Sequence, residues 1–260
     1  MPFTLAHPAA VLPLRRVAYL RSAPLIIGAM TPDLPDFLPG GAVRYVRVTH
    51  LFAHSFTIDL LLGYAALVVI VLLQRPLTAL LWPRARVLCL RALEPFRRIS
   101  TWAWAGPAIL LGVWTHLLWD AFTHPEGWIV LRMPALTAPI VVGPYHGPIY
   151  HTLQYLTSIV GLCVMVLWYD RLPTRGGGAG DKASRSPAGP VLLLIVAAAT
   201  LIGSVRATQQ FRHERSVYHT IDVFCTDTLK WFAVLYLTAG IVLTLEHRPD
   251  QSGVPSSRAQ

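Results

Sequence analysis

The sequence predicts an all-α fold: a polytopic transmembrane helical bundle with about five spans, preceded by an N-terminal hairpin of short helices. Of its 260 residues, 54% are hydrophobic and 13% are charged, and the mean hydropathy is +0.50. A soluble domain usually carries about 25% charged residues. Several apolar runs approach the roughly 17–25 residues that a helix needs to cross a bilayer. Composition therefore indicates lipid as the solvent.

The expected spans follow from the apolar segments, and the fifth is extended backwards by residues 221–228. The five segments cover residues 56–73, 104–122, 152–169, 190–205 and 230–245. Two earlier apolar pieces, 9–20 and 23–30, are too short to span, and the second stops at a Pro/Asp string. We therefore expect a re-entrant hairpin there, since a broken backbone is tolerated at membrane depth where protein buries it or a wet cavity lines it.

The basic residues predict the organisation and the orientation. The net charge of +9 suggests a nucleic-acid partner, but the basic residues lie in loops between apolar runs, so no nucleic acid is expected. Fifteen of the 22 Lys and Arg residues fall on one side, which should be cytoplasmic. We expect one integral domain over residues 1–250 in the bacterial inner membrane, with a flexible linker at 171–189 and a disordered tail at 251–260.

On that topology, eight of the ten histidines fall at the non-cytoplasmic face. They are His50, His54, His116, His124, His146, His151, His213 and His219. Arginines alone set the topology, so this clustering is independent of any assumed function. His7 joins the group only if the N-terminal hairpin returns to the outer face.

The sharpest motif runs from Thr115 to Pro125. His116, Asp120 and His124 follow one another at intervals of four, so one helical face carries all three. Imidazole and carboxylate are ligands for zinc, manganese or iron. Ionisable groups inside an apolar span suggest a functional site. The structural alternative is that the carboxylate orients a histidine or bonds a neighbouring helix.

Two weaker motifs precede it. His50 and His54 have the spacing of a zincin pair but lack its glutamate, and the alternative is the start of an interfacial helix. Asp33 and Asp36 stand three residues apart among prolines. They could bind a cation or supply a general base. A Pro/Asp turn at a helix end is the alternative meaning of that string.

Five ordered blocks resemble the bacterial domain of unknown function 4184 family, a family of multi-pass membrane proteins. The blocks are MPFTLAHPAAVLPLRR, LIIGAMTPDLPDFL, HLFAHSFTIDLLLGY, THLLWDAFTHPEGW and LQYLTSIVGL. They span most of residues 1–170, and the likeness continues loosely through the last two spans. This resemblance implies an architecture and no particular activity.

A more distant resemblance is to the inner-membrane metal-dependent hydrolases described as LexA-binding. Four motifs of that family have counterparts in the same order: Ala6-His7, Pro32-Asp33 with Asp36, His50 with His54-Ser55, and His116 with Asp120. The second aspartate is displaced by one residue, Phe37 stands where the family has histidine, and Ala53 stands where it has threonine. The resemblance implies a polymetal site, which these departures would alter or remove.

The leading hypothesis is a membrane-embedded metal-dependent hydrolase. One or more divalent ions, with zinc as the first candidate, would be held by His7, Asp33, Asp36, His54, His116 and Asp120. Asp36 or His124 would act as general base. The substrate would be a lipid or lipid-linked phosphoester near the outer face of the bilayer.

Two hypotheses from other classes remain open. In a transporter, the same groups would relay protons or coordinate a carried ion. In a non-catalytic scaffold, the His/Asp pairs would join helices. Ligands gathered within reach of one ion favour the hydrolase, a continuous polar path favours the transporter, and scattered, satisfied pairs favour the scaffold.

Overall fold

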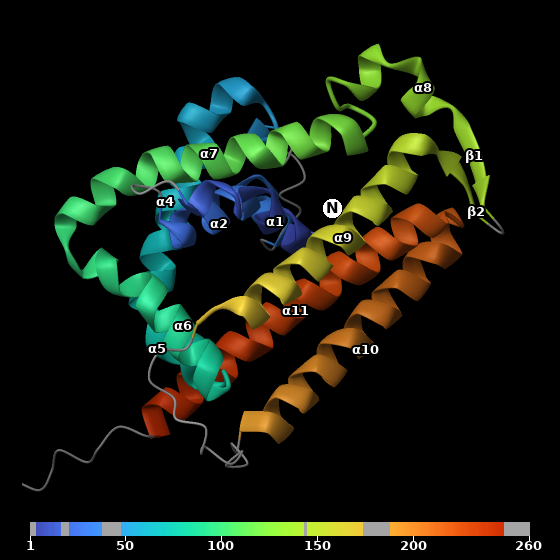
Figure 1. The fold of residues 1–260 in the computed structure, drawn as a ribbon. Coiled ribbons are helices and arrows are strands. Elements are labelled where there is room, and N and C mark those ends of the chain that lie inside the picture. Colours follow the sequence, from blue (N-terminus) through green and yellow to red (C-terminus); the bar gives the residue numbers. More distant parts are fainter. Residues whose placement is uncertain (1–3, 17–20, 38–47, 143–144, 174–187, 247–260) are drawn as a thin grey trace, which may run out of the picture.

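A computed structural model of the chain describes residues 4–16, 21–37, 48–142, 145–173 and 188–246. The predicted all-α helical bundle is confirmed (Figure 1). The predicted tail at 251–260 and most of the predicted linker at 171–189 lie outside the described residues. Arg171 is the last residue of one helix, and Ala188 is the first of the next.

The N-terminal part consists of short helical pieces. They are η1 (Thr4–Ala6), α1 (Pro8–Val11), η2 (Leu14–Arg16), α2 (Ser22–Met30), η3 (Thr31–Phe37), η4 (Phe52–Phe56) and α4 (Ile58–Leu72). Prolines help to explain why these helices are short. Pro35 lies inside η3 and has no backbone N–H to donate, which a short 3-10 helix tolerates better than a long α-helix does. The expected hairpin of short helices is therefore present.

The segment between the first two predicted spans is helical as well, although the sequence suggested only a basic linker. It contains α5 (Gln74–Ala79), α6 (Pro83–Leu93) and η5 (Glu94–Arg97). Arg84 donates hydrogen bonds to the carbonyl oxygens of Tyr169, Asp170 and Leu172 at the end of α9. A cation at the carboxyl end of a helix is favourable, because the last carbonyls there have no partner within the helix.

Long helices make up the rest, with one hairpin. They are α7 (Ile99–Thr123), α9 (Ile149–Arg171), α10 (Ala188–Glu214) and α11 (Val217–Glu246). Between α7 and α9 lie η6 (Val130–Arg132), α8 (Pro134–Thr137) and an antiparallel pair, β1 (Pro139–Val142) and β2 (Tyr145–Pro148), which the sequence did not predict. The last predicted span and its backward extension form one helix, α11.

Three helices of the described residues are long and apolar enough to cross a membrane. They are Ile149–Arg171, Gly189–Glu214 and Val217–Glu246. Two predicted spans are not among them: α4 has only 15 residues, and α7 carries polar groups along its length. Apolar helices of this length indicate a membrane environment.

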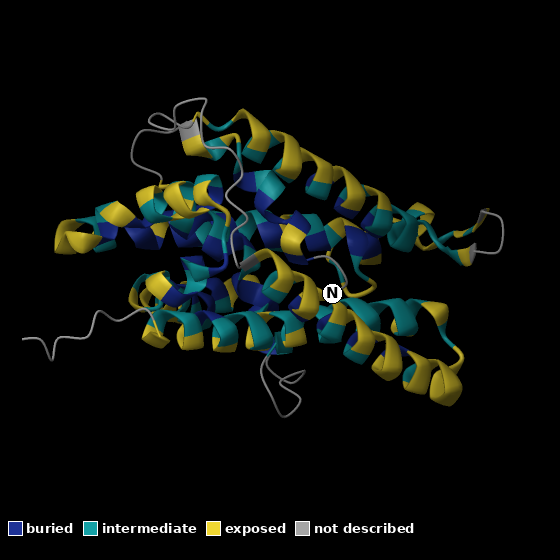
Figure 2. Ribbon diagram, turned by 90° about the horizontal axis from the view of Figure 1, so that it is seen from below, coloured by how far each residue is buried: buried dark blue, intermediate teal, exposed yellow. Residues whose placement is uncertain are grey.

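The core lies in the N-terminal half. In Figure 1, α7 passes across α1 and α2, and α10 and α11 lie side by side away from it. Buried residues gather in the middle of the molecule in Figure 2. Most of them belong to the segment between Thr4 and Val130. The candidate functional residues lie in this densely packed half.

Candidate functional site

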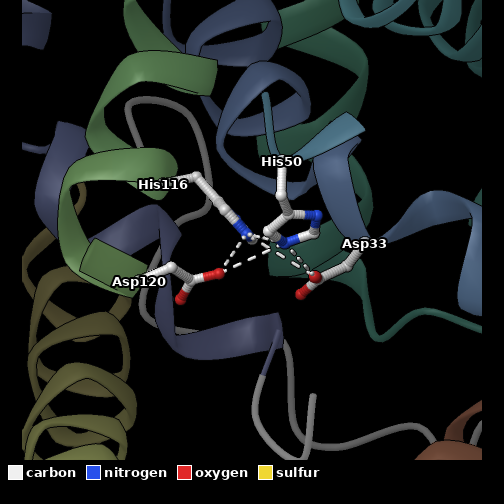
Figure 3. A group of neighbouring side chains, drawn as sticks. All are labelled: Asp33, His50, His116 and Asp120. Carbon is white, nitrogen blue, oxygen red and sulfur yellow. Dashed lines mark hydrogen bonds and ion pairs between the residues drawn. The ribbon is translucent and has the colours of Figure 1, made fainter. Parts of the chain in front are cut away.

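Four side chains from three segments converge on one point inside the N-terminal half. Asp33, His50, His116 and Asp120, here called the His–Asp group, each offer one ligand atom, and these atoms all lie within 4.8 Å of one another. Figure 3 shows two imidazole rings and two carboxylates facing a shared centre. His116 and Asp33 are fully buried, Asp120 is nearly so, and His50 retains 21% side-chain exposure. The group is therefore reached from solvent mainly past His50.

The distances between these atoms are short and nearly uniform. His116 Nε2 lies 3.0 Å from Asp120 Oδ2 and 3.5 Å from Asp33 Oδ1. His50 Nε2 lies 3.2 Å and 3.5 Å from the same two oxygens. The two Nε2 atoms are 3.4 Å apart. Among the described residues, Asp33 and Asp120 form ion pairs with histidines alone.

These carboxylates are close to ring nitrogens without being hydrogen-bonded to them. Asp33 Oδ1 and both oxygens of Asp120 are buried and accept no hydrogen bond from the described residues. Buried polar atoms are almost always hydrogen-bonded, so three such oxygens in one place require an explanation. The ring nitrogens and the carboxylate oxygens converge on the space between them instead of pointing at one another.

Helix α7 supplies two of the four side chains because His116 and Asp120 lie one turn apart on its buried face. Helix α2 packs closely against that face through glycines. A Cβ on Gly112 would lie 2.4 Å from the carbonyl oxygen of Leu25, and one on Gly28 would fall onto the backbone of Ile109. Small residues permit this backbone contact, as is common where membrane helices pack.

The close packing allows the α2 backbone to orient one of the imidazoles. The ring Nδ1 of His116 lies 2.8 Å from the carbonyl oxygen of Ala29. A carbonyl only accepts, so this contact places the proton on Nδ1 and leaves the lone pair of Nε2 facing the group. Metal-bound histidines typically have such a second partner.

The two remaining members come from η3 and from the turn before η4. Asp33 is fixed through its outer oxygen, because Thr4 Oγ1 donates a 2.7 Å hydrogen bond to Oδ2. The segment carrying His50 is tied to η3, since Thr49 Oγ1 donates to the carbonyl oxygen of Pro32 at 2.7 Å. Both ties are buried. They tie the N-terminal piece and the segment that carries His50 to η3.

Two more histidines flank the outer oxygen of Asp120. His124 Nδ1 lies 3.2 Å and His7 Nε2 lies 3.7 Å from Asp120 Oδ1. The His7 ring stacks on His116 with centroids 4.0 Å apart. Asp120 is thus in contact with four imidazoles and lies at the centre of the site.

The pKa values of His50 and His7, which lie outside the predicted spans, shift in opposite directions. Burial lowers the pKa of His50, but the nearby carboxylates of Asp120 and Asp33 outweigh this and raise it to about 9. Burial, aided by the neighbouring His116, lowers the pKa of His7 to about 4. Burial also raises the pKa of Asp36. His7 is therefore a neutral imidazole at physiological pH.

Three of the six predicted metal ligands lie in the His–Asp group: Asp33, His116 and Asp120. His7 lies beside it, in contact with Asp120. His54 and Asp36 are not among the four members. The ring Nδ1 of His54 faces the carbonyl oxygen of Val48 at 3.0 Å.

His50 occupies the place expected for His54, and the backbone explains why. The i, i+4 pairing assumed a continuous α-helix, but Leu51 is extended and η4 begins only at Phe52. The two histidines therefore do not share a helical face. Both histidines fit the motif. Only the position at which η4 begins shows which of the two faces the His–Asp group.

Two supporting residues, Thr4 and Gln154, gave no sequence signal. Gln154 is buried on α9, and its amide nitrogen lies 2.9 Å from His124 Nε2. Thr4 belongs to the N-terminal piece, 29 positions from its partner Asp33. Neither belongs to a spaced motif, because contacts between distant segments leave no local pattern.

Comparison with known proteins gives a family and no further relatives. The model of a family described as a domain of unknown function, DUF4184, matches residues 1–245. No curated protein and no solved structure matches. The match extends over almost the whole chain and includes every residue of the site. The chain therefore belongs to the DUF4184 family, as its five sequence blocks indicated.

Proposed function

We propose that the His–Asp group binds a divalent metal ion and that the protein is a membrane-embedded, metal-dependent hydrolase. The observation that carries this proposal is the convergence of two imidazoles and two carboxylates whose inner oxygens accept no hydrogen bond from the described residues. An ion at the shared centre would satisfy all of them at once.

The spacing fits tetrahedral coordination. Zinc bonds to imidazole nitrogen and carboxylate oxygen of about 2.0–2.1 Å place the ligands of a regular tetrahedron about 3.3–3.4 Å apart. Five of the six ligand pairs in the His–Asp group are separated by 3.0 to 3.5 Å. The donor types also suit manganese or iron.

Charge balance supports the same ion. Two ionised carboxylates and two neutral imidazoles carry two negative charges, which a divalent cation neutralises. A buried pair of carboxylates without a compensating charge would cost several kcal/mol, of the order found for buried ions. Without a metal, a protonated His50 is the alternative source of positive charge, since Asp120 and Asp33 outweigh burial and raise its pKa to about 9.

Proton sharing alone accounts less well for the geometry. His116 presents its Nε2 lone pair, so His50 can direct its Nε2–H at that atom across 3.4 Å. That arrangement leaves Asp33 Oδ1 and both Asp120 oxygens without a donor. This difference favours the metal centre over a proton relay.

An ion held there would need a fifth coordination position, beyond its four protein ligands, to polarise a phosphoryl or acyl oxygen and lower the pKa of water. The residues of the chain hold and orient the ligands. Thr4 fixes Asp33, and the carbonyl oxygen of Ala29 fixes His116. Asp36 is the proposed general base, since burial raises the pKa of its carboxyl toward the range where a base is effective.

A lipid or lipid-linked phosphoester is the proposed substrate class, at the non-cytoplasmic face of the bacterial inner membrane. Three helices of membrane-spanning length in the same chain support this location. The arginine asymmetry supports the side.

An activity screen tests the hydrolase proposal. The detergent-purified protein, stripped of metal and reloaded with zinc or manganese, is incubated with phospholipids and soluble phosphoesters in mixed micelles. We expect metal-dependent release of a product by the wild type and none by Asp120→Asn. His219→Ala is the matched control, because that exposed histidine pairs with Glu214 away from the site. Activity that survives in Asp120→Asn, or that ignores metal, would contradict the proposal.

A further inference from the structure

An apolar groove lies between the N-terminal piece η1 and the last two helices, α10 and α11. Its volume is about 250 Å³. The described residues that line it carry no charge, and they include Thr4, Leu5, Val196, Thr200, Phe224 and Phe232. Such walls give a hydrocarbon ligand apolar contacts and leave a charged group without a partner. The groove is therefore suited to an apolar chain.

The groove follows the axes of α10 and α11. Phe224, Thr228 and Phe232 stand at intervals of four on one face of α11, and they cover about 12 Å of it at 1.5 Å per residue. Val196 and Thr200 have the same spacing on α10. Both helices are long and apolar enough to cross a membrane. A chain in the groove would therefore run along these helices, as the hydrocarbon chains of the surrounding lipids do.

Hydrocarbon is the occupant that these surroundings supply. Leu5 and Val196 are 45% and 44% exposed, so the groove is open along its side. Helices of membrane length face acyl chains, and water finds no set of hydrogen-bonding partners on an apolar wall. An empty groove would forfeit the dispersion contacts of its lining. The chain of a membrane lipid satisfies these conditions.

One residue of the groove also supports the His–Asp group. Thr4 is 2% exposed, and its hydroxyl donates the 2.7 Å hydrogen bond to Asp33 Oδ2. The piece that carries Thr4 is held against α9, since a Cβ on Gly161 would lie 3.0 Å from the carbonyl oxygen of Ala6. Thr4 thus belongs both to the wall of the groove and to the support of a proposed metal ligand. The groove and the site are neighbours.

We infer that this groove binds one hydrocarbon chain of a membrane phospholipid, with the phosphate of the same molecule at the His–Asp group. The placement of the phosphate rests on the proposed function, whereas binding of the chain in the groove does not. The inference narrows the proposed substrate class from a lipid or lipid-linked phosphoester to a phospholipid.

Native mass spectrometry of the full chain in detergent, with phosphatidylglycerol added, tests the inference. We expect one phospholipid retained per chain, with or without bound metal. Val196→Trp and Thr200→Trp should each reduce the retained phospholipid by more than about 10-fold, because an indole takes the space of the chain. Leu194→Trp is the matched control and should retain the phospholipid, since Leu194 is 70% exposed on α10 and is not among the residues that line the groove. An unchanged unfolding midpoint shows that each variant is folded.

The outcomes separate the inference from the proposed function. A wild type that retains no phospholipid, or equal retention by the wild type and both groove variants, would overturn the inference. Retained phospholipid that the metal-loaded protein does not hydrolyse would uphold binding of the chain and contradict the hydrolase. Equal kcat/KM for a phospholipid and for a soluble phosphoester would overturn the groove as part of the substrate site and leave the hydrolase in place.

Discussion

The two halves of the molecule differ in how far their helices are buried within the protein. From Thr4 to Val130 the chain forms short helical pieces and the 25-residue helix α7, which bury polar groups, among them Asp33, His116 and Asp120. From Ile149 onward it forms three long helices whose membrane-length windows are at most 22% buried in the protein. The first half therefore depends on its own packing, and the second depends on a surrounding apolar phase. The candidate ligands come from the broken helices and from α7, and the apolar helices of the second half indicate a membrane environment.

The largest expected effect is the loss of a ligand in the first half. We predict that His50→Ala weakens metal binding by more than about 100-fold, beyond the usual effect of losing a supporting partner. His54→Ala should leave binding unchanged, because that ring faces the Val48 carbonyl. Isothermal titration with zinc measures both. Equal effects of the two variants would show that the η4 segment is placed differently.

The next effect concerns the contact between α2 and α7. We predict that Gly112→Ala lowers the free energy of unfolding by about 1–3 kcal/mol, as overpacking does. The added Cβ meets the α2 backbone at 2.4 Å. Gly189→Ala is the matched control, since nothing lies within 4 Å of a Cβ there. Thermal unfolding in detergent gives both values, and equal midpoints would contradict the close packing of α2 on α7.

A smaller effect is expected from a residue that only supports a ligand. Thr4→Val removes the hydrogen bond to Asp33 Oδ2 and should weaken metal binding by about 10-fold. Thr4→Ser keeps the hydroxyl and should restore binding. The zinc affinities of the two variants are measured by competition with a chelator. Their comparison shows whether Thr4 acts through its hydrogen bond to the carboxylate or only through packing. A serine variant as weak as the valine variant would argue against the hydrogen bond.

The smallest effect belongs to the second half. Leu194 on α10 is 70% exposed, so Leu194→Ala removes few contacts within the protein and opens no cavity there. We predict a change below about 0.5 kcal/mol in unfolding free energy and no change in metal content. Thermal unfolding and elemental analysis check this. A large loss of stability would show that another surface covers this face of α10.

The sequence predicted the elements of the second half better than those of the first. Long apolar runs define α9, α10 and α11, because length and hydropathy alone determine such helices. In the first half, His116 and Asp120 were found because one continuous helix carries both. His50 was named in a motif but not among the expected ligands, and the sequence did not predict the break at Leu51 that separates it from His54. Thr4 and Gln154 were invisible, since only tertiary packing brings them to Asp33 and His124.

The most direct test of the account is elemental analysis of the purified wild-type protein beside His116→Ala and Asp120→Asn, each checked for native helix content and a cooperative unfolding transition. The account predicts bound zinc, manganese or iron in the wild type, at one ion per chain, and its loss in both variants. A folded wild type that carries no metal after loading with divalent ions would contradict it. The buried histidines and aspartates would then be joined by shared protons.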